Sequence, residues 1–433
     1  MSLFDRLTQY TAQDVMPFHM PGHKRNTAML DGALPFALDI TEIDGFDNLQ
    51  NPTGILRDLS RRAADLWGSR AAYISVNGST GAILAGIRAM TKPNDTVLVA
   101  RNCHMSVFHA LELCFLRPVL LEPEWNGDFG IYDAITQETF DATLASAPQA
   151  VLAIVTSPTY EGVETRIRSN IPLLIDAAHG AHLPLPNGDI VVHSLHKTLP
   201  ALTQTALLHV CSNKIDMRKL EHQLRVFQTS SPSYILMASI DRCVALLEQR
   251  KQELFAAWAS RLDVFYANAA HWTSLRLFAA PHDRSKLLIA CADANALAAH
   301  LRAAALEPEY AHGQLVLLMT SPCDTLDMMR KLTEVLNDFD AKKSSFVKIK
   351  KTQKPPAALL RQFPAEAIHA PHETILINDA IGRVSAKYAW LYPPGAPVLL
   401  PGQEITSDLA AFLHNHGAAL HGDRPFPQVD VLC

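Results

Sequence analysis

Two short stretches carry the fold prediction for this chain: His-Ser-Leu-His-Lys-Thr at residues 193–198 and Asp-Ala-Ala-His at residues 176–179. Each contains or follows a short apolar run, so Asp176 and Lys197 are both expected at strand ends. Open α/β sheets bind ligands at the carboxyl ends of their strands. A lysine placed there can condense with an aldehyde, and an aspartate can keep a pyridine nitrogen protonated. The pair therefore indicates a site for pyridoxal phosphate (PLP).

The surrounding sequence predicts a large α/β domain. Short apolar runs alternate with segments long enough for helices or turns, as in a mainly parallel sheet that is covered on both faces. A single run of this kind could be a buried helical turn, but six in order favour a sheet. The runs are residues 72–76, 96–100, 151–156, 172–176, 190–195 and 205–210.

The second half of the chain predicts a long helix, a smaller α/β domain and a compact C-terminal domain. Apolar side chains keep helical spacing over residues 235–265. The polar, proline-ended stretch at 342–356 predicts a linker. The later expected strands are 286–290 and 314–319, and the later expected helices are 294–306 and 328–339. The expected divisions are 1–60 for an N-terminal segment, 61–250 for the large PLP-binding domain, 251–342 for the small domain, and 343–433 for the linker and C-terminal domain.

Composition indicates a globular protein that does not bind nucleic acid or span a membrane. The 433 residues are 48% hydrophobic and 19% charged, unlike a disordered chain, and several domains are expected at this length. The net charge of -5 offers no basic excess for a nucleic acid. We find neither an export signal nor an apolar run that could span a membrane. The seven scattered cysteines are expected to be reduced, which predicts a cytoplasmic location.

A phosphate-binding turn is expected at residues 76–81, Val-Asn-Gly-Ser-Thr-Gly. Here a strand runs into Gly78, Ser79 and Thr80 and then into a helix, whose N–H groups and dipole favour an anion. A capped helix after a strand gives the same letters. The interpretation of this turn as a phosphate site is therefore supported mainly by Asp176 and Lys197 further along the chain.

Three more residues extend the cofactor site. Ser194 and His196 flank the lysine and are expected within reach of the phosphate, and His104 follows a strand, where its ring could stack on the pyridine. Each residue also has a structural interpretation, because aspartates often cap helices, lysines are usually solvated and histidines are often packed. The apolar residues after Lys197 favour a pocket, in which desolvation lowers the pKa of a lysine and frees its amine.

A metal site is the main competing interpretation of the second stretch. Asp176, His179 and His182 are spaced by threes and could bind zinc in a hydrolase. That interpretation leaves the Ser-x-His-Lys run at 194–197 unexplained, so we favour PLP and expect no metal.

The motifs together resemble a known family, the PLP-dependent decarboxylases of fold type I (aspartate aminotransferase-like) that act on ornithine, lysine and arginine. The matching motifs follow one another in order along nearly the whole chain. They are residues 18–26, 39–47, 76–80, 176–182, 194–200, 228–234, 380–383, 392–395 and 401–402.

The resemblance implies roles for the matching residues. Lys197 would form the internal aldimine, Asp176 would pair with the pyridine nitrogen, His179 would lie beside the cofactor and His104 would stack on its ring. The phosphate would be held by Ser79, Thr80, Ser194 and His196, and by Thr229, Ser230 and Ser231 of a partner chain. The resemblance thus implies a homodimer with its sites at the interface. The long N-terminal wing domain of the large bacterial members has no counterpart among these motifs, so their decamer is not assumed for this chain.

The implied reaction is the α-decarboxylation of a basic amino acid to its amine. The distal cation of such a substrate needs an acidic partner. The candidates for substrate contacts are Glu42, Asp44, Asp47 and Asp379, together with His19 and His23. The chain departs from the family pattern at Ala177, where the family usually has glutamate, and at Gln403, where the glutamate is shifted to Glu404.

Other outcomes stay open at the level of sequence. PLP also supports transamination, deamination or cyclisation of a basic amino acid, because the cofactor-binding residues are shared. A metal-dependent hydrolase and a non-catalytic homologue are the remaining alternatives. An intact Lys197 and Asp176 argue against the last.

Overall fold

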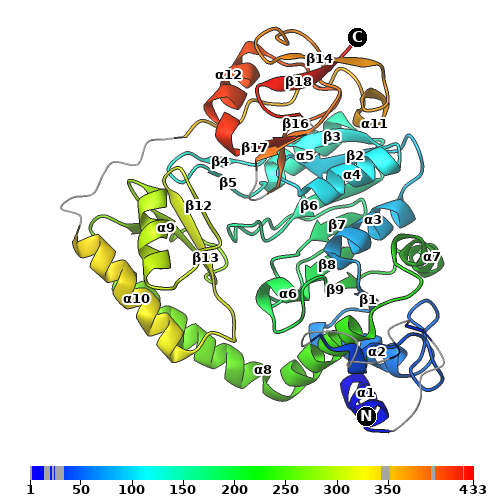
Figure 1. Ribbon diagram of the computed structural model, residues 1–433. Helices are drawn as coiled ribbons and strands as arrows, with labels where there is room; N and C mark the ends of the chain where they lie inside the picture. Colours follow the sequence, from blue (N-terminus) through cyan, green and yellow to red (C-terminus); the bar gives the residue numbers. More distant parts are fainter. Residues whose placement is uncertain are drawn as a thin grey trace. The chain divides into compact units, whose positions relative to one another are not determined.

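The computed structural model describes residues 2–13, 20–21, 24, 34–342, 352–391, 395–422 and 424–433 (Figure 1). Contacts between residues divide the chain into two compact units. The first unit comprises Met1–Ala89, Ala177–Trp258 and Ser321–Cys323, and the second comprises Met90–Asp176, Ala259–Thr320 and Asp324–Cys433. Among the described residues, none of the helices combines the length and apolar character needed to cross a bilayer.

In the first unit, strand β9 (Ala206–Val210) lies between β1 (Ala71–Ser75) and β8 (Ile190–Ser194) and runs antiparallel to both. The carboxyl-terminal residues of β1 and β8, Ser75 and Ser194, are both paired with Ala206. The segments that follow these two strands therefore begin at the same edge of the sheet. They lead into helix α3 (Gly78–Met90) and helix α6 (Leu195–Thr198), which carry the expected phosphate turn and Lys197.

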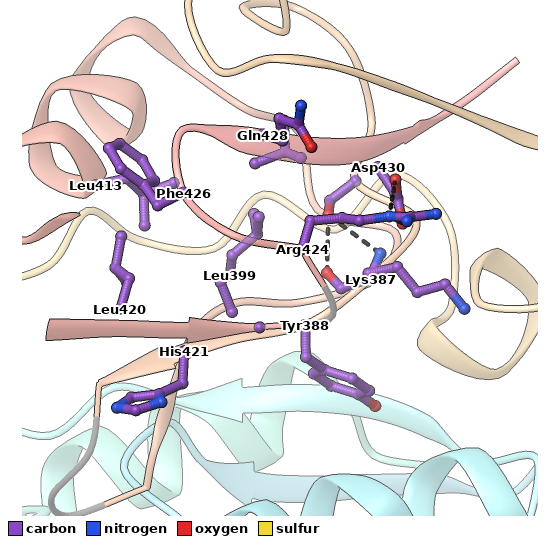
Figure 2. A pocket seen from close by; sticks show the side chains of 14 residues that line it. Lys387, Tyr388, Leu399, Leu413, Leu420, His421, Arg424, Phe426, Gln428 and Asp430 are labelled. Carbon is purple, nitrogen blue, oxygen red and sulfur yellow. Dashed lines mark hydrogen bonds and ion pairs between the residues drawn. The ribbon is translucent and has the colours of Figure 1, made fainter. Parts of the chain in front are cut away.

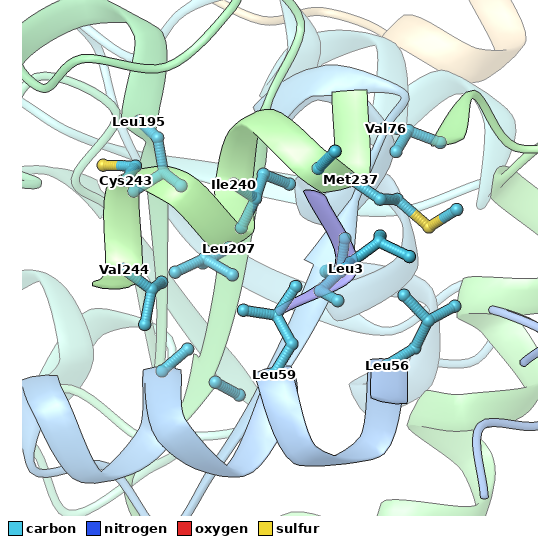
Figure 3. Packing of buried hydrophobic residues seen from close by; sticks show 14 of the residues in the cluster. Leu3, Leu56, Leu59, Val76, Leu195, Leu207, Met237, Ile240, Cys243 and Val244 are labelled. Carbon is cyan, nitrogen blue, oxygen red and sulfur yellow. The ribbon is translucent and has the colours of Figure 1, made fainter. Parts of the chain in front are cut away.

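The first unit is stabilised by an apolar cluster that also anchors the lysine helix (Figure 3). Leu3, Leu56, Leu207 and Ile240, from four different elements, are all fully buried in it. Leu195, the first residue of α6, is buried in the same cluster. Each such side chain contributes about 1.5–3 kcal/mol on burial. The remaining helices of this unit are α1 (Leu3–Thr11), η2 (Phe36–Leu38), α2 (Ile55–Trp67), α7 (Met217–Phe227) and most of α8 (Tyr234–Ala269).

The second unit contains four parallel strands in the order β7 (Leu173–Asp176), β6 (Leu152–Thr156), β2 (Thr96–Ala100) and β3 (Arg117–Leu121). Helices α4 (Met105–Leu113) and α5 (Gln137–Ser146) connect them. Because the strands are parallel, the end of β7 at Asp176 and the end of β2 at Ala100 lie at the same edge of the sheet. A short hairpin, β4 (Trp125–Asn126) and β5 (Ile131–Tyr132), follows β3.

Two smaller layers complete the second unit. The first is an antiparallel sheet in the order β10-β11-β13-β12, on which α9 packs. Its elements are β10 (Arg276–Leu277), β11 (Lys286–Ala290), α9 (Ala294–Ala303), β12 (Tyr310–His312), β13 (Leu315–Met319) and α10 (Leu326–Ala341). The second is the C-terminal region, residues 352–433. It contains α11 (Pro364–Ala367), β14 (His372–Leu376), β15 (Ala389–Leu391), β16 (Pro397–Leu399), α12 (Ser407–Asn415), η3 (Gly417–Ala419), β17 (Leu420–Gly422) and β18 (Gln428–Leu432).

The predicted fold class is confirmed. The six predicted runs coincide with strands to within one residue at either end, and the long helix is α8, of 36 residues. Strand β3 was not predicted, and β9 is the antiparallel exception in a mainly parallel arrangement. The predicted domain divisions stay predictions. The division between residues 60 and 61 falls within α2, and the division between residues 250 and 251 falls within α8.

Candidate active site

The expected phosphate turn is fixed by hydrogen bonds within the first unit. Gly78 has a φ of 69°, which favours glycine, and its N–H donates to the Gln204 carbonyl at 3.0 Å. The Ser75 hydroxyl donates to the Gly78 carbonyl at 2.8 Å. The Ser194 hydroxyl, fully buried at the end of β8, donates to the Ser79 hydroxyl at 3.0 Å. The turn and the strand before Lys197 are therefore directly joined.

This turn has the donors that a phosphate needs. The first N–H groups of an α-helix have no acceptor within the helix, and the dipole gives that end a partial positive charge. Ser79 and Thr80 lie in the first turn of α3, where Ser79 is half-buried and Thr80 is exposed. Hydroxyls and helix N–H groups on an accessible turn fit the phosphate of PLP.

Lys197 lies directly beside His179. The distance between Nζ of Lys197 and Nε2 of His179 is 2.9 Å. His179 is only 6% exposed. Its loop is held by a bond from the Ala177 N–H to the Val192 carbonyl at 2.9 Å and by a turn from the Gly180 N–H to the Ala177 carbonyl. In the tautomer of neutral His179 that carries its hydrogen on Nδ1, Nε2 is an acceptor and can take a hydrogen bond from the lysine ammonium.

His196, next to the lysine, is held in its neutral form. Its Nδ1 lies 3.1 Å from the Thr205 carbonyl, so Nδ1 carries the hydrogen. Burial lowers the pKa of His196, the bond to Thr205 opposes this shift, and the nearby charge of Lys197 lowers the pKa further. His196 is therefore suited to polar contacts rather than to carrying charge.

The second unit brings Asp176 and the loop of His104 to one strand edge. Asp176 ends β7 and is 3% exposed. Burial raises the pKa of the Cys103 thiol to about 12, and the negative charge of Asp176 adds to this shift. Cys103 immediately precedes His104. The aspartate and the histidine loop are therefore close enough to interact electrostatically.

His104 forms the N-cap of α4. Its Nδ1 accepts a hydrogen bond from the Ser106 N–H at 3.2 Å and lies 3.0 Å from the Ser106 hydroxyl. The residue as a whole is exposed. An imidazole that is held through one nitrogen while it remains exposed is suited to stacking on a flat ligand.

The candidate substrate carboxylates differ in their surroundings. Asp47 accepts hydrogen bonds from the backbone N–H groups of residues 48, 53, 54 and 56. Burial works to raise its pKa, but these bonds outweigh it and lower the pKa, so this carboxylate is already committed to its own loop. Asp44 and Asp379 are exposed. Among the described residues, the buried Oε1 of Glu42 has no hydrogen-bond partner. His19 and His23 lie outside the described residues.

The expected interface hydroxyls lie on an exposed segment. Thr229, Ser230 and Ser231 are all exposed, and the Ser231 N–H donates to the Thr229 hydroxyl at 3.2 Å. The Gln50 side chain donates to the Thr229 carbonyl at 3.0 Å. The backbone of this segment is thus fixed while its hydroxyls stay accessible.

The two departures from the family pattern lie in buried backbone. Ala177 is fully buried at the start of the His179 loop. Gln403 is also fully buried, and its side-chain oxygen accepts a bond from the Leu400 N–H at 3.1 Å. Glu404 is paired with Arg361 at 2.7 Å. We therefore find no free carboxylate at the shifted position.

The zinc alternative gains no support from the geometry. The ring of His182 packs against Trp258 at 5.3 Å, while His179 contacts the lysine amine. Within the described ranges, no group of three or more histidines, cysteines or carboxylates is placed to hold a metal ion.

The C-terminal region contains a pocket (Figure 2). Apolar side chains such as Leu399 and Phe426 line one part of it, and Lys387, Arg424 and Asp430 line another. Arg424 is paired with the buried Asp430 at 3.3 Å. None of the residues predicted for the cofactor lines this pocket.

Sequence reasoning missed the residues that fix the site. It identified Lys197, Asp176 and His179, but not the contact between the lysine and His179. It also missed Arg101, which is 1% exposed and lies three residues before His104. A charged residue placed between an apolar strand and a candidate site residue was the available signal.

Comparisons with known proteins point to one family. The family model for the Orn/Lys/Arg decarboxylase major domain matches residues 1–261, and the model for the C-terminal domain matches residues 342–428. The uncharacterized protein YaaO of Bacillus subtilis is 30% identical over 453 residues, which cover 94% of this chain and 92% of YaaO. An arginine decarboxylase of Bacillus subtilis is 27% identical over 459 residues, which cover 95% of this chain and 92% of that protein.

Solved structures share the fold. The Francisella novicida lysine decarboxylase LdcF has a TM-score of 0.84 and 17% sequence identity, and the match covers 100% of this chain and 81% of LdcF. A structure of SPT with PLP as an internal aldimine has a TM-score of 0.53 and 15% identity, covering 68% of this chain and 80% of SPT.

Proposed function

The chain belongs to the Orn/Lys/Arg decarboxylase family, and from this premise we propose that its substrate is arginine. PLP is its cofactor, and the decarboxylation of a basic amino acid is its reaction. The choice of arginine is supported by the curated arginine decarboxylase, which aligns over 95% of this chain.

The contact between Lys197 and His179 carries the proposed assignment of the site. We assign Lys197 as the covalent attachment point of PLP, with His179 as the acceptor of the lysine proton, because the nitrogens are 2.9 Å apart. Ser79, Thr80 and Ser194 are assigned to the phosphate, with support from the bond between Ser194 and Ser79. His196 is assigned as a neutral neighbour of the phosphate.

The buried carboxylate and the exposed imidazole complete the assignment. When bound, PLP supplies a sink for the electron pair that the departing carboxylate leaves behind. Asp176 keeps a proton on the pyridine nitrogen, which makes that sink effective. His104, which is exposed at the start of α4, would pack against one face of the cofactor. By holding the cofactor and the substrate, these residues would select which bond of the substrate breaks.

The distal cation of the substrate is assigned to Glu42. A buried carboxylate oxygen without a partner is unfavourable unless a cation or donor meets it. Oε1 of Glu42 is such an oxygen among the described residues. A guanidinium can bind both oxygens of a carboxylate at once, which makes arginine a suitable partner.

We also propose a cytoplasmic homodimer. The exposed hydroxyls of Thr229, Ser230 and Ser231 support a contact with the phosphate in a second copy of the chain. Val226 is 58% exposed and Leu202 is 49% exposed, so the first unit offers apolar side chains that such a copy could cover. The free cysteines support a reducing compartment.

Substrate profiling tests the proposal. Purified protein is supplied with PLP and incubated separately with arginine, lysine and ornithine, and carbon dioxide and amine are measured, with Lys197→Ala as the inactive control. We expect stoichiometric carbon dioxide and agmatine from arginine. Faster release from lysine or ornithine would overturn the substrate assignment. A keto acid or cyclic product without carbon dioxide would overturn the reaction.

A further inference from the structure

Arg101 is a fully buried cation that joins the end of β2 to the C-terminal region. It is 1% exposed. Its Nη1 donates to the Pro397 carbonyl, and its Nη2 donates to the Val398 carbonyl at 2.9 Å. Both acceptors belong to the backbone of β16. Arg101 therefore contacts the backbone of the C-terminal region, and the contact does not depend on the side chains of β16.

Because Arg101 is buried, its charge must be compensated by its hydrogen bonds. Burying an ion is costly unless hydrogen bonds or an opposite charge compensate it. Among the described residues, no carboxylate forms an ion pair with Arg101, and its Nε has no hydrogen-bond partner. The two carbonyls of β16 are thus its hydrogen-bonding acceptors. Removing them would leave a buried charge without compensation, so the guanidinium and β16 hold each other in place.

Further contacts attach the same region just beyond His104. The Met105 N–H donates to the Gly395 carbonyl at 3.2 Å. The Tyr388 hydroxyl donates to the Phe108 carbonyl at 3.3 Å, and the Tyr388 ring packs edge-on against His109. The C-terminal region therefore holds both the start of the loop, at Arg101, and its end, at Met105.

We propose that Arg101 is a positioning residue that lets the C-terminal region set the orientation of His104. His104 lies between the two anchors and has the extended backbone of an N-cap, with φ −64° and ψ 153°. A shift of either anchor rotates this backbone and, with it, the imidazole. The inference rests on the proposed function in one respect, the stacking of His104 on the PLP ring.

Arg117, at the opposite end of the same strands, offers a matched control. The Arg117 guanidinium lies over the Phe363 ring at 4.7 Å and so also links the sheet to the C-terminal region. Arg117 begins β3 and is paired with Thr96, the first residue of β2. It is therefore distant in the sheet from His104, which follows the other end of β2. Loss of this contact weakens the same region without disturbing the His104 loop.

The test compares Arg101→Met, Arg101→Lys, Tyr388→Phe and Arg117→Met with wild-type holoenzyme. The readouts are the circular dichroism of the bound cofactor in the visible range, kcat and KM for arginine, and the thermal midpoint. We expect Arg101→Met to change the cofactor dichroism and lower kcat by about 10- to 100-fold, because small displacements near a reacting group have such effects. Arg101→Lys should recover part of both, Tyr388→Phe should give a smaller change in the same direction, and Arg117→Met should change only the thermal midpoint.

The outcomes separate this inference from the proposed function. If Arg101→Met does not fold, the milder Arg101→Lys and Tyr388→Phe variants decide by the same readouts. Wild-type dichroism and kcat in the folded Arg101 variants would overturn the positioning role, as would an equal change in Arg117→Met. If wild-type protein bound PLP but released no carbon dioxide from any basic amino acid, the proposed function would fail, while the dichroism would still report on Arg101.

Discussion

Nζ of Lys197 and Nε2 of His179 lie 2.9 Å apart, although Lys197 belongs to helix α6 and His179 to a separate loop of the first unit. The lysine is held by a short helix whose first residue, Leu195, is buried in the apolar cluster. The histidine is held by the turn at Gly180. Because both sides are anchored independently, the contact is a property of the fold rather than of one flexible side chain.

This contact predicts that His179 promotes loading of the cofactor. An amine attacks an aldehyde only when it is neutral, and His179 can accept the proton that the amine must lose. We expect His179→Asn apoprotein to capture PLP about 10- to 100-fold more slowly at pH 7, with a smaller defect at pH 9.5. Stopped-flow absorbance of the lysine-bound cofactor measures the rate. His182→Asn is the control, and an equal defect there would show that the effect is structural.

The bond between Ser194 and Ser79 predicts coupled losses of cofactor affinity. Ser79→Ala and Ser194→Ala each remove one of two hydroxyls that touch at 3.0 Å. Each change should weaken PLP binding by about 10- to 150-fold, because a hydrogen bond to a charged group contributes roughly 1.5–3 kcal/mol. Groups in contact are not additive. The double variant, measured by equilibrium dialysis, should therefore lose less than the product of the two, and strict additivity would mean that the hydroxyls act independently.

The unpaired oxygen of Glu42 predicts a residue that selects the substrate charge. Glu42→Gln keeps the shape of the side chain and removes its charge. We expect the KM for arginine to rise about 10- to 100-fold, since a charged hydrogen bond is lost, with a smaller change in kcat. Asp44→Asn is the matched control, because Asp44 is two residues away and exposed. An unchanged KM in Glu42→Gln, or the same rise in Asp44→Asn, would exclude this role.

The strands, and the positions of Asp176 and Lys197 at strand ends, could be predicted because their signals are local. Each predicted run is a continuous apolar stretch with polar flanks, and Asp176 and Lys197 are read directly at the ends of such runs. Strand β3 was missed because Arg117 and Pro118 interrupt its apolar pattern, although a parallel edge strand tolerates both. The direction of β9 depends on the loop from Leu199 to Thr205 and not on its own residues.

The contacts that organise the site depend on residues distant in sequence. Arg101 and β16 are almost 300 residues apart, so nothing near Arg101 indicates its acceptors. Asp47 illustrates the opposite case: its motif suggested a substrate carboxylate, an assignment that stays a prediction. The structure instead shows four backbone N–H groups of the neighbouring loop bound to it. The geometry of the neighbouring backbone decides whether a carboxylate accepts hydrogen bonds from its own loop or binds a ligand, and the sequence pattern does not specify that geometry.

A buried histidine pair joins the strand that leads to Lys197 to the neighbouring strand. His193 of β8 and His209 of β9 are fully buried, with ring centroids 4.9 Å apart. The Ser69 hydroxyl lies 3.0 Å from Nδ1 of His209, and the Trp67 ring lies beside both histidines. Burial lowers the pKa of His209 to about 3. Burial also lowers the pKa of His193 well below its usual value, and the neighbouring His209 and His182 add to this shift.

The pair predicts a loss of stability in weak acid. The folded protein keeps both rings neutral, whereas the unfolded chain takes up a proton at each below the ordinary histidine pKa of 6.5. The free energy of unfolding should therefore fall as the pH drops from 6.5 towards 3, by up to about 1.4 kcal/mol per pH unit for each histidine. Urea midpoints at pH 7.0 and 5.0 measure this, and His193→Gln or His209→Gln should reduce the difference between them. His222→Gln, which changes an exposed histidine, should leave the difference as in wild type. Equal differences in all four proteins would show that other groups govern the acid response.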